Sequence, residues 1–251
     1  MELKATILRY ESLPSTNTEA ANQARRGAPE GLCIVARAQT QGRGRQGRTW
    51  ASPPGAGLYF SIVLRPRIEA RWWPLLSLLG ALASRDALRE ACALVADIKW
   101  PNDLLVEERK IGGVLAEVIE TELGRACILG IGLNLRDGAF PREIRATATS
   151  VERVSGEAPD TETVLQALVR AIADWYGALH APAGPERICR EWEASSSYAF
   201  NRRVRATVGS ETIEGLTRGL ELDGALRLET EDGRIERIYS ADIVSLRGVA
   251  G

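Results

Sequence analysis

Short apolar runs separated by turn-forming residues mark out the first half of the chain. They predict strands over residues 5–10, 32–38, 58–64, 98–106, 110–119 and 126–134, the fourth broken by a turn at Pro101. The last three runs follow one another through turns alone. The helices are therefore too few for a regular βαβ alternation, and the pattern favours a mostly antiparallel sheet.

Apolar residues at helical spacing predict the long helices. One is expected from Trp73 to about Cys92, and its leucines belong to the core rather than to a cofactor site. Asp160 is placed to cap a helix over 162–179, and Pro185 fits the first turn of another.

A shorter helix is expected near Thr16, because Thr16 and Glu19 have the spacing of a capping box. The polar residues there either only cap the helix or present hydroxyl, amide and free N–H groups to a ligand. Residues 136–160 are rich in small, charged and turn-forming residues, and we expect them to be irregular.

The pattern changes near residue 200. Beyond it, short alternating strands are separated by glycines, which predicts a small β-barrel. We therefore divide the chain into domains at 1–200 and 201–251.

Composition narrows the class of partner. The 251 residues are 45% hydrophobic and 26% charged, and the formal net charge is −1. A chain without a global positive field is not expected to recruit nucleic acid. The four cysteines are scattered, the chain starts without a signal peptide, and no apolar run is long enough to cross a membrane, so a cytoplasmic location and no membrane partner are expected.

The single histidine, His180, excludes zinc sites built on several histidines. It lies at an expected helix end, where a histidine more often interacts with the helix dipole than serves as a catalyst. No metal-ligating residue is assigned.

The segment Gln39–Trp50 holds the densest candidate chemistry, with three glycines and three arginines within residues 42–48. Its Gly-x-Gly-x-x-Gly string is not a dinucleotide fingerprint, because Arg-Thr-Trp-Ala-Ser-Pro-Pro follows where a helix would have to start. A protein kinase would need a His-Arg-Asp motif that the chain lacks. Arginines at the variable positions favour direct side-chain contact with an anion.

Three other motifs are ambiguous on their own. Lys110 stands before Gly112 and Gly113, the pair Asn102-Asp103 follows a proline, and Asn134 ends a strand. Each has an ordinary structural explanation as a surface or turn residue.

Together these motifs resemble one family. Gly-Arg-Gly-Arg-Gln-Gly-Arg-Thr-Trp (42–50), Lys-Trp-Pro-Asn-Asp (99–103), Lys-Ile-Gly-Gly-Val-Leu-Ala-Glu (110–117) and Gly-Ile-Gly-Leu-Asn (130–134) occur in the order seen in biotin protein ligases. The resemblance runs from about Leu8 to Arg247.

The resemblance implies an α+β catalytic domain with a mixed, largely antiparallel sheet and flanking helices, as in class II aminoacyl-tRNA synthetases, followed by a small SH3-like barrel. It implies that biotin and Mg-ATP give biotinyl-5′-AMP, and that the biotinyl group then passes to a lysine of a biotin carboxyl carrier domain of acetyl-CoA carboxylase or a related carboxylase. No room is left for the DNA-binding domain of some relatives, and a homodimer is allowed.

The resemblance also assigns residues. The biotin-binding set is Ser15, Thr16, Asn17, Gln39, Arg43, Gly44, Arg45, Lys110, Gly112 and Gly113. The nucleotide-binding set is Arg48, Trp50, Asn134 and Arg247. The catalytic set is Lys110, Arg45 and Asp103. Cations must offset the repulsion when a carboxylate attacks an α-phosphate, and Asp103 is the candidate to orient the acceptor lysine.

The chain departs from the family at Asn201-Arg-Arg-Val204 and at Tyr239-Ser-Ala-Asp242, both in the C-terminal domain. Two other functions stay open. A lipoate or octanoate ligase would need a long apolar tunnel, whereas a non-catalytic biotin sensor would tolerate the loss of the residues that face ATP.

Overall fold

The protein is described by a computed structural model that covers residues 3–137 and 140–245. Its larger sheet has seven strands in the order β1-β2-β3-β7-β6-β5-β4. The strands are β1 (Thr6–Leu13), β2 (Leu32–Gln39), β3 (Gly57–Leu64), β4 (Asp97–Lys99), β5 (Asp103–Val106), β6 (Arg109–Thr121) and β7 (Gly124–Asn134). Only β1 and β2 run parallel, so the prediction of a mixed, largely antiparallel sheet is confirmed.

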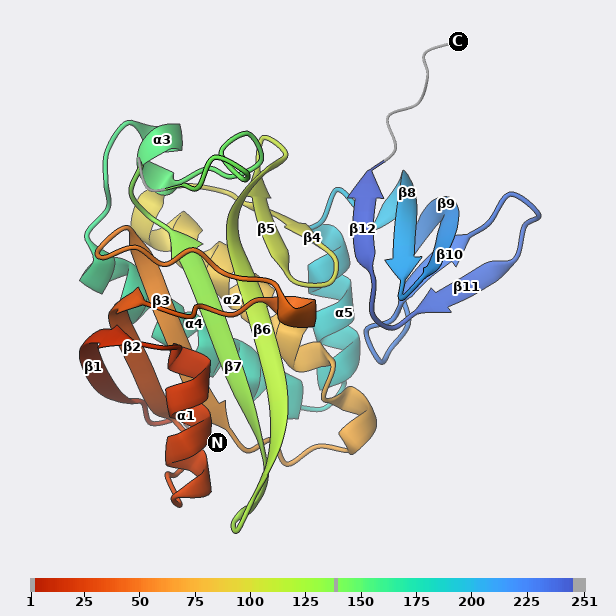
Figure 1. The fold of residues 1–251 in the computed structure, drawn as a ribbon. Coiled ribbons are helices and arrows are strands. Elements are labelled where there is room, and N and C mark those ends of the chain that lie inside the picture. Colours follow the sequence, from red (N-terminus) through yellow and green to blue (C-terminus); the bar gives the residue numbers. More distant parts are fainter. Residues whose placement is uncertain (1–2, 138–139, 246–251) are drawn as a thin grey trace.

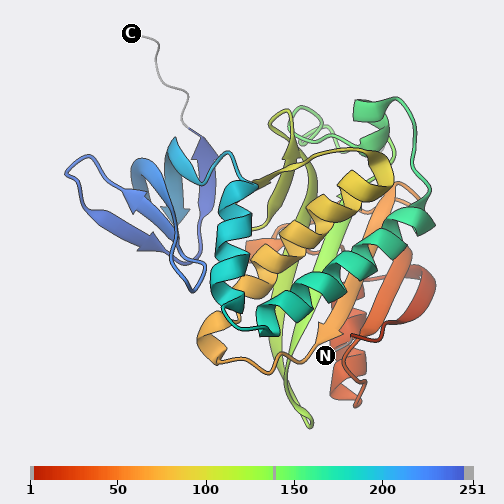
Figure 2. The ribbon, with the colours of Figure 1, turned by 180° about the vertical axis from the view of Figure 1, so that it is seen from behind.

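Helices cover both faces of this sheet. The long helices α2 (Leu75–Cys92) and α4 (Thr161–His180) lie across the back face, with α5 (Gly184–Ala194) beside them (Figure 2). The short helix α1 (Thr16–Arg25) lies on the front (Figure 1). All eight residues of the interior strand β3 are buried for this reason, which explains why its sequence is almost continuously apolar rather than alternating.

The main core lies between the back face of the sheet and α2, α4 and α5. The leucines predicted as core in α2 are buried there, as expected. A smaller apolar cluster joins α1 to the front face through alanines of the helix, among them Ala20 and Ala24, and through Ile34, Val63 and Ile128 of the sheet.

The start of α1 differs from the prediction. The N-cap residue is Ser15, not Thr16, and its hydroxyl makes no capping bond. The backbone N–H of Thr16 instead donates to Oε1 of Gln39 at 2.8 Å. The expected capping box is therefore wrong, because a distant side chain supplies the acceptor and leaves Ser15 uncommitted at the helix end.

The remaining helix predictions need one correction. Asp160 caps α4 through the backbone N–H of Thr163 at 2.9 Å, and a proline occupies the first turn of α5, as expected. The stretch 136–160, predicted as irregular, contains the short helix α3 (Val151–Ser155). Ser150 caps this helix. The sequence does not predict it because five residues are too few to show a helical periodicity of apolar positions.

The C-terminal strands form a second, antiparallel sheet in the order β11-β10-β9-β8-β12. They are β8 (Phe200–Val208), β9 (Glu211–Leu220), β10 (Leu226–Glu229), β11 (Ile235–Ile238) and β12 (Asp242–Ser245). No pairing joins the edge strands β11 and β12 among the described residues, so closure into a barrel stays a prediction. The sheet is joined to the rest of the protein by buried contacts such as the bond from Trp100 Nε1 to the carbonyl of Gly224 at 3.0 Å.

Several smaller expectations can be compared with the structure. The four cysteines are free thiols, three of them buried. His180 is the last residue of α4, where its ring nitrogens bond to the carbonyl of Tyr176 and the N–H of Arg67, a structural role. Within the described ranges, no helix is both long enough and apolar enough to cross a membrane.

Candidate functional site

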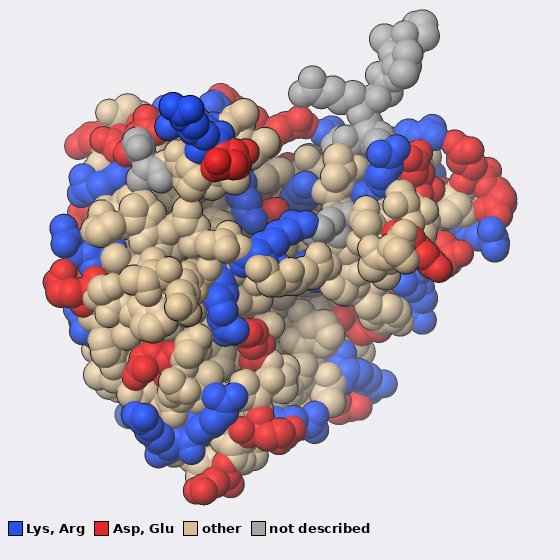
Figure 3. Space-filling model, in the orientation of Figure 1, with Lys and Arg blue, Asp and Glu red and all other residues tan. Residues whose placement is uncertain are grey.

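A cavity of about 410 Å³ is lined by the segment after β2 and by residues of β6, β7 and β12. This segment passes in front of β6 and β7 in Figure 1. Lysine and arginine side chains gather near the centre of the front face, and charged side chains of both signs lie along its lower part and its edges (Figure 3). The cavity is lined by residues from both sheets, including Ala241 and Ile243 from the C-terminal one.

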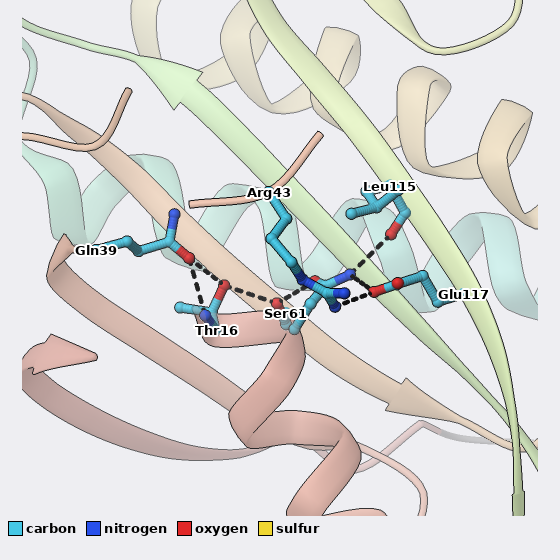
Figure 4. Close-up of polar contacts among 7 residues, drawn as sticks. Thr16, Gln39, Arg43, Ser61, Leu115 and Glu117 are labelled. Atoms are coloured by element: carbon cyan, nitrogen blue, oxygen red, sulfur yellow. Dashed lines mark hydrogen bonds and ion pairs between the residues drawn. The ribbon is translucent and has the colours of Figure 1, made fainter. Parts of the chain in front are cut away.

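One end of the cavity is neutral and polar. Ser15, Thr16 and Asn17 at the start of α1 are 3–4% exposed and line it. Thr16 Oγ1 donates to Oε1 of Gln39 at 3.2 Å and lies 2.8 Å from Ser61 Oγ, which also lies 2.6 Å from Oδ1 of Asn17 (Figure 4). These groups can recognise a small polar ring by hydrogen bonds alone.

Glycines on β7 make room for this end. A Cβ on Gly130 would stand 2.0 Å from Oδ1 of Asn17, and a Cβ on Gly132 would stand 2.6 Å from the ring of Trp50. Each glycine pairs with a residue of the neighbouring strands. Gly130 of β7 is opposite Ser61 of β3 and Leu115 of β6, and Gly132 of β7 is opposite Gly113 of β6. The sheet surface is therefore hollowed where Asn17 and Trp50 approach it.

The segment Gln39–Trp50 folds as a hairpin over the cavity. The N–H of Trp50 donates to the carbonyl of Gly42 at 2.9 Å, and the N–H of Gly44 donates to the carbonyl of Arg48 at 2.7 Å. A single 3-10 turn, η1 (Arg45–Gly47), forms its tip. The arrangement presents three guanidinium groups to one ligand-sized space.

The arginines contact different parts of the protein. Arg43 pairs with Glu117 of β6, with Nη2 and Oε2 2.6 Å apart. Arg45 bonds to Ser240 Oγ at 2.7 Å and to Oδ1 of Asn102 at 3.4 Å, and so links the hairpin to both sheets. Arg48 also lines the cavity.

The other end of the cavity holds a lysine and a carboxylate. Lys110 Nζ lies 2.5 Å from Oδ1 of Asp103 and 5.4 Å from the ring centroid of Trp50. Their side chains are 34% and 24% exposed, so both remain accessible to a ligand. Together with the hairpin arginines, Lys110 makes this end suitable for a phosphate or carboxylate group.

A β-bulge aims Lys110. Leu104 is opposite Gly112 and Leu105 is opposite Lys110, so Ile111 is the extra residue between them. The bulge shifts by one residue the alternation of side chains between the two faces of the sheet, so Lys110 and Gly113 share the face that carries the cavity. A Cβ on Gly113 would accordingly lie 3.4 Å from Lys110 Nζ. Gly112 consequently faces the back of the sheet, where a Cβ would meet Leu133.

Asn134 and the segment after β7 complete this end. Asn134 Nδ2 donates to the carbonyl of Thr149 at 3.0 Å. Thr149 N and Thr147 O bond in turn to the backbone of Lys110. Phe140 and Ile144 add apolar surface to the wall.

The structure brings most of the predicted site residues into this one cavity. Gly112 does not line it, and Arg247 lies outside the described residues. Sequence reasoning gave no role to Ser61, Gly130 or Glu117. Strand alternation from Asn134 could have placed Gly130 on the same face, but nothing in the sequence marks Ser61 or Glu117 as neighbours of Asn17.

No cluster of three or more His, Cys, Asp or Glu side chains suited to a metal ion occurs in the part of the chain that the structure describes. The cavity offers a single carboxylate beside a lysine rather than a protein-made cage.

Residues 10–134 match the biotin/lipoate A/B protein ligase family, and residues 199–245 match the biotin protein ligase C-terminal domain. The chain is 37% identical over 240 residues to the bifunctional ligase/repressor BirA of Bacillus subtilis, covering 94% of this chain and 73% of that protein. It is 36% identical to the biotin–[acetyl-CoA-carboxylase] ligase of Paracoccus denitrificans, covering 88% of this chain and 92% of the relative.

A solved structure shares the fold. The biotin protein ligase of Aquifex aeolicus in complex with biotin and ATP superposes with a TM-score of 0.83 and 30% identity, covering 97% of this chain and 99% of that one.

Proposed function

The chain belongs to the biotin protein ligase family, and from this premise we propose that the cavity over β6 and β7 binds biotin and ATP side by side. The protein is an ATP-dependent biotin protein ligase. One observation carries the assignment of the site: a neutral hydrogen-bonding end and a cationic end share one cavity of about 410 Å³.

The neutral end fits the ureido ring of biotin. Ser15, Thr16 and Asn17 supply hydroxyl and amide groups there, and Gln39 holds Thr16 in place. A purely apolar acyl chain would gain no hydrogen bond from these groups, whereas a ring that carries N–H and C=O groups can use their remaining hydrogen-bonding capacity. The biotin carboxylate would then extend toward Gly113, Lys110 and the hairpin arginines.

The cationic end supports the first step. The biotin carboxylate attacks the α-phosphorus of ATP, the bond to the pyrophosphate oxygen breaks, and biotinyl-5′-AMP remains. Lys110 and Arg45 lie where they can offset the repulsion between the two anions and stabilise the charge that develops on phosphate oxygens. Arg48, Trp50 and Asn134 would face the nucleotide.

The hairpin would shield the acyl-adenylate from water. Its residues Arg43, Gly44, Arg45 and Arg48 line the cavity, and water that reached the acyl-adenylate there would hydrolyse it in competition with transfer. Arg247 keeps its proposed nucleotide role from the resemblance alone.

In the second step the acceptor lysine amine attacks the acyl carbon and AMP leaves. A lysine amine has an ordinary pKa of about 10.4, so it must be deprotonated near the site. Asp103 would orient this amine and take its proton once Lys110 has turned to the phosphate; the support is its position in the cavity beside Lys110.

Mg²⁺ would enter with the nucleotide. Asp103, the single carboxylate among the described residues that line the cavity, fits an ion held mainly by triphosphate oxygens and water, as Mg²⁺ often is in phosphoryl-transfer sites. Bound there, it would withdraw negative charge from the phosphates.

The acceptor is a biotin carrier of a carboxylase such as acetyl-CoA carboxylase. We further propose that residues 1–200 act as the catalytic domain and 201–251 as the barrel domain, and that the chain binds no DNA. A homodimer and a cytoplasmic location stay predictions.

The test is a mass measurement. The protein is incubated with ATP, an apo-carrier domain, and either biotin or lipoate. A biotin-dependent gain in carrier mass that also requires ATP is expected. A gain with lipoate alone would favour a lipoate ligase, and biotin binding without any gain would favour a sensor.

A further inference from the structure

The motif Lys110–Glu117 ends on Glu117, a residue that has no role in the proposed function. Glu117 lies on β6, beyond the part of the strand that pairs with β5. One of its oxygens, Oε2, accepts two bonds: from Nδ2 of Asn17 at 2.8 Å and from Nη2 of Arg43 at 2.6 Å (Figure 4). A single carboxylate therefore touches both the neutral end of the cavity and the hairpin that covers it.

The contacts of Asn17 fix the direction of its amide. Nδ2 donates to Oε2 of Glu117 and to the carbonyl of Leu115 at 3.3 Å, so both of its hydrogens are used. Oδ1 lies 2.6 Å from the hydroxyl of Ser61. A flipped amide would direct its oxygen at a carboxylate and a carbonyl, which is repulsive.

We propose that Glu117 is a positioning residue that makes Asn17 a hydrogen-bond acceptor toward the biotin ring and ties this state to closure of the hairpin. Both hydrogens of Nδ2 are occupied, and Oδ1 still has a second lone pair besides the one that faces Ser61, so Oδ1 is the amide atom that can accept from a ligand and it selects a ring N–H. The inference rests on the proposed binding of biotin at this end of the cavity.

Arg43 adds the link to the hairpin. It stands opposite Thr49 in the hairpin, and its side chain reaches down to β6. The ion pair is partly exposed, with side chains 44% and 33% accessible, so on its own it contributes little. Its effect comes from sharing the carboxylate oxygen with a buried amide, because a closed hairpin and an oriented Asn17 then favour the same position of Glu117.

Two substitutions separate the two contacts. Glu117→Ala removes both, whereas Glu117→Gln keeps an amide oxygen that can accept from Asn17 but loses the charge that holds Arg43. Glu120→Ala is the matched control, since Glu120 is on the same strand, carries the same charge and is 81% exposed.

The first measurement is the rate of adenylate formation, which is monitored through the release of pyrophosphate. Glu117→Ala should raise KM for biotin about tenfold or more, the scale of leaving one buried amide without its partner, with kcat changed less than threefold or so. Glu117→Gln should recover most of this loss, and Glu120→Ala should match the wild type.

The second measurement is specificity. Two carbamate analogues of biotin each replace one ring N–H by oxygen, and so remove one donor. The wild type should reject the analogue that lacks the donor facing Asn17. Glu117→Ala should lose most of this discrimination, because only the longer contact with the Leu115 carbonyl, at 3.3 Å, then opposes a flip of the Asn17 amide, and Glu117→Gln should retain it.

The outcomes are separable. An equal fall in kcat and kcat/KM with discrimination unchanged, or wild-type behaviour of Glu117→Ala, would overturn the inference while leaving the ligase function standing. If the wild-type chain forms no biotinyl adenylate, the proposed function itself fails. In that case the carbamate assay gives no information on Glu117. Calorimetry of biotin binding would still test the positioning role, and binding by the wild type that is weaker in Glu117→Ala would support it.

Discussion

Gly130→Ala tests the hollow in the sheet that admits Asn17. The added Cβ would stand 2.0 Å from Oδ1, 2.8 Å from Cγ and 3.0 Å from Nδ2 of Asn17. Ordinary contact begins at 3.4 Å, so Asn17 would have to retreat by 3.4 − 2.0 = 1.4 Å. It is held by Ser61 at 2.6 Å and Glu117 at 2.8 Å, and a shift of this size breaks at least one of these bonds.

The expected cost follows from two contributions. Forcing a methyl group into a filled site costs about 1–3 kcal/mol. Losing one buried hydrogen bond adds about 1 kcal/mol. We therefore expect the free energy of unfolding to fall by roughly 2–4 kcal/mol, and biotin affinity to fall about tenfold or more because Asn17 is displaced from its acceptor position.

The assays are urea denaturation and biotin calorimetry, with Gly177→Ala as the matched control. A Cβ on Gly177, in the interior of α4, meets nothing within 4 Å, and it should stabilise the protein by about 0.5–1 kcal/mol. In an Asn17→Ala background the three clashing atoms are gone, so Gly130→Ala should then cost less than about 0.5 kcal/mol. The full penalty persisting in that background would refute the reasoning.

Four other outcomes are expected. Lys110→Ala should abolish adenylate formation while the far-ultraviolet circular dichroism is kept, and pyrophosphate release at the wild-type rate would reject its role. Asp103→Ala should slow transfer to the carrier more than adenylate formation, whereas equal losses would contradict the assignment. Trypsin should cut within residues 43–48 more slowly once biotin and ATP are bound, and an unchanged cutting rate would argue against closure. Burial raises the pKa of the Cys33 and Cys127 thiols from 9.0 to about 12, so these thiols ionise at lower pH in the unfolded chain than in the folded protein. The urea midpoint should therefore fall as the pH rises above about 9. Replacing either cysteine by alanine should reduce this pH dependence.

Much of the fold could be predicted because burial leaves a periodic trace in the sequence. The apolar run 58–64 and the helical spacing from Trp73 to Cys92 both correspond to elements buried in the core. The start of α1 could not be predicted from local spacing. Its acceptor is Gln39, 23 positions away, and no local rule anticipates a cap supplied by another strand.

The sequence by itself determined most of the order of the elements, the segment rich in glycine and arginine, and the motifs that resemble biotin protein ligases. Only the tertiary structure decided which side chains meet. Strand alternation alone would put Lys110 and Gly113 on opposite faces, and the bulge at Ile111 returns them to the same one. In the same way, Glu117 becomes a partner of Asn17 only because α1 lies over β6, 100 positions along the chain. The strand register and the position of α1 over the sheet are properties of the assembled protein, and a linear sequence pattern does not contain them.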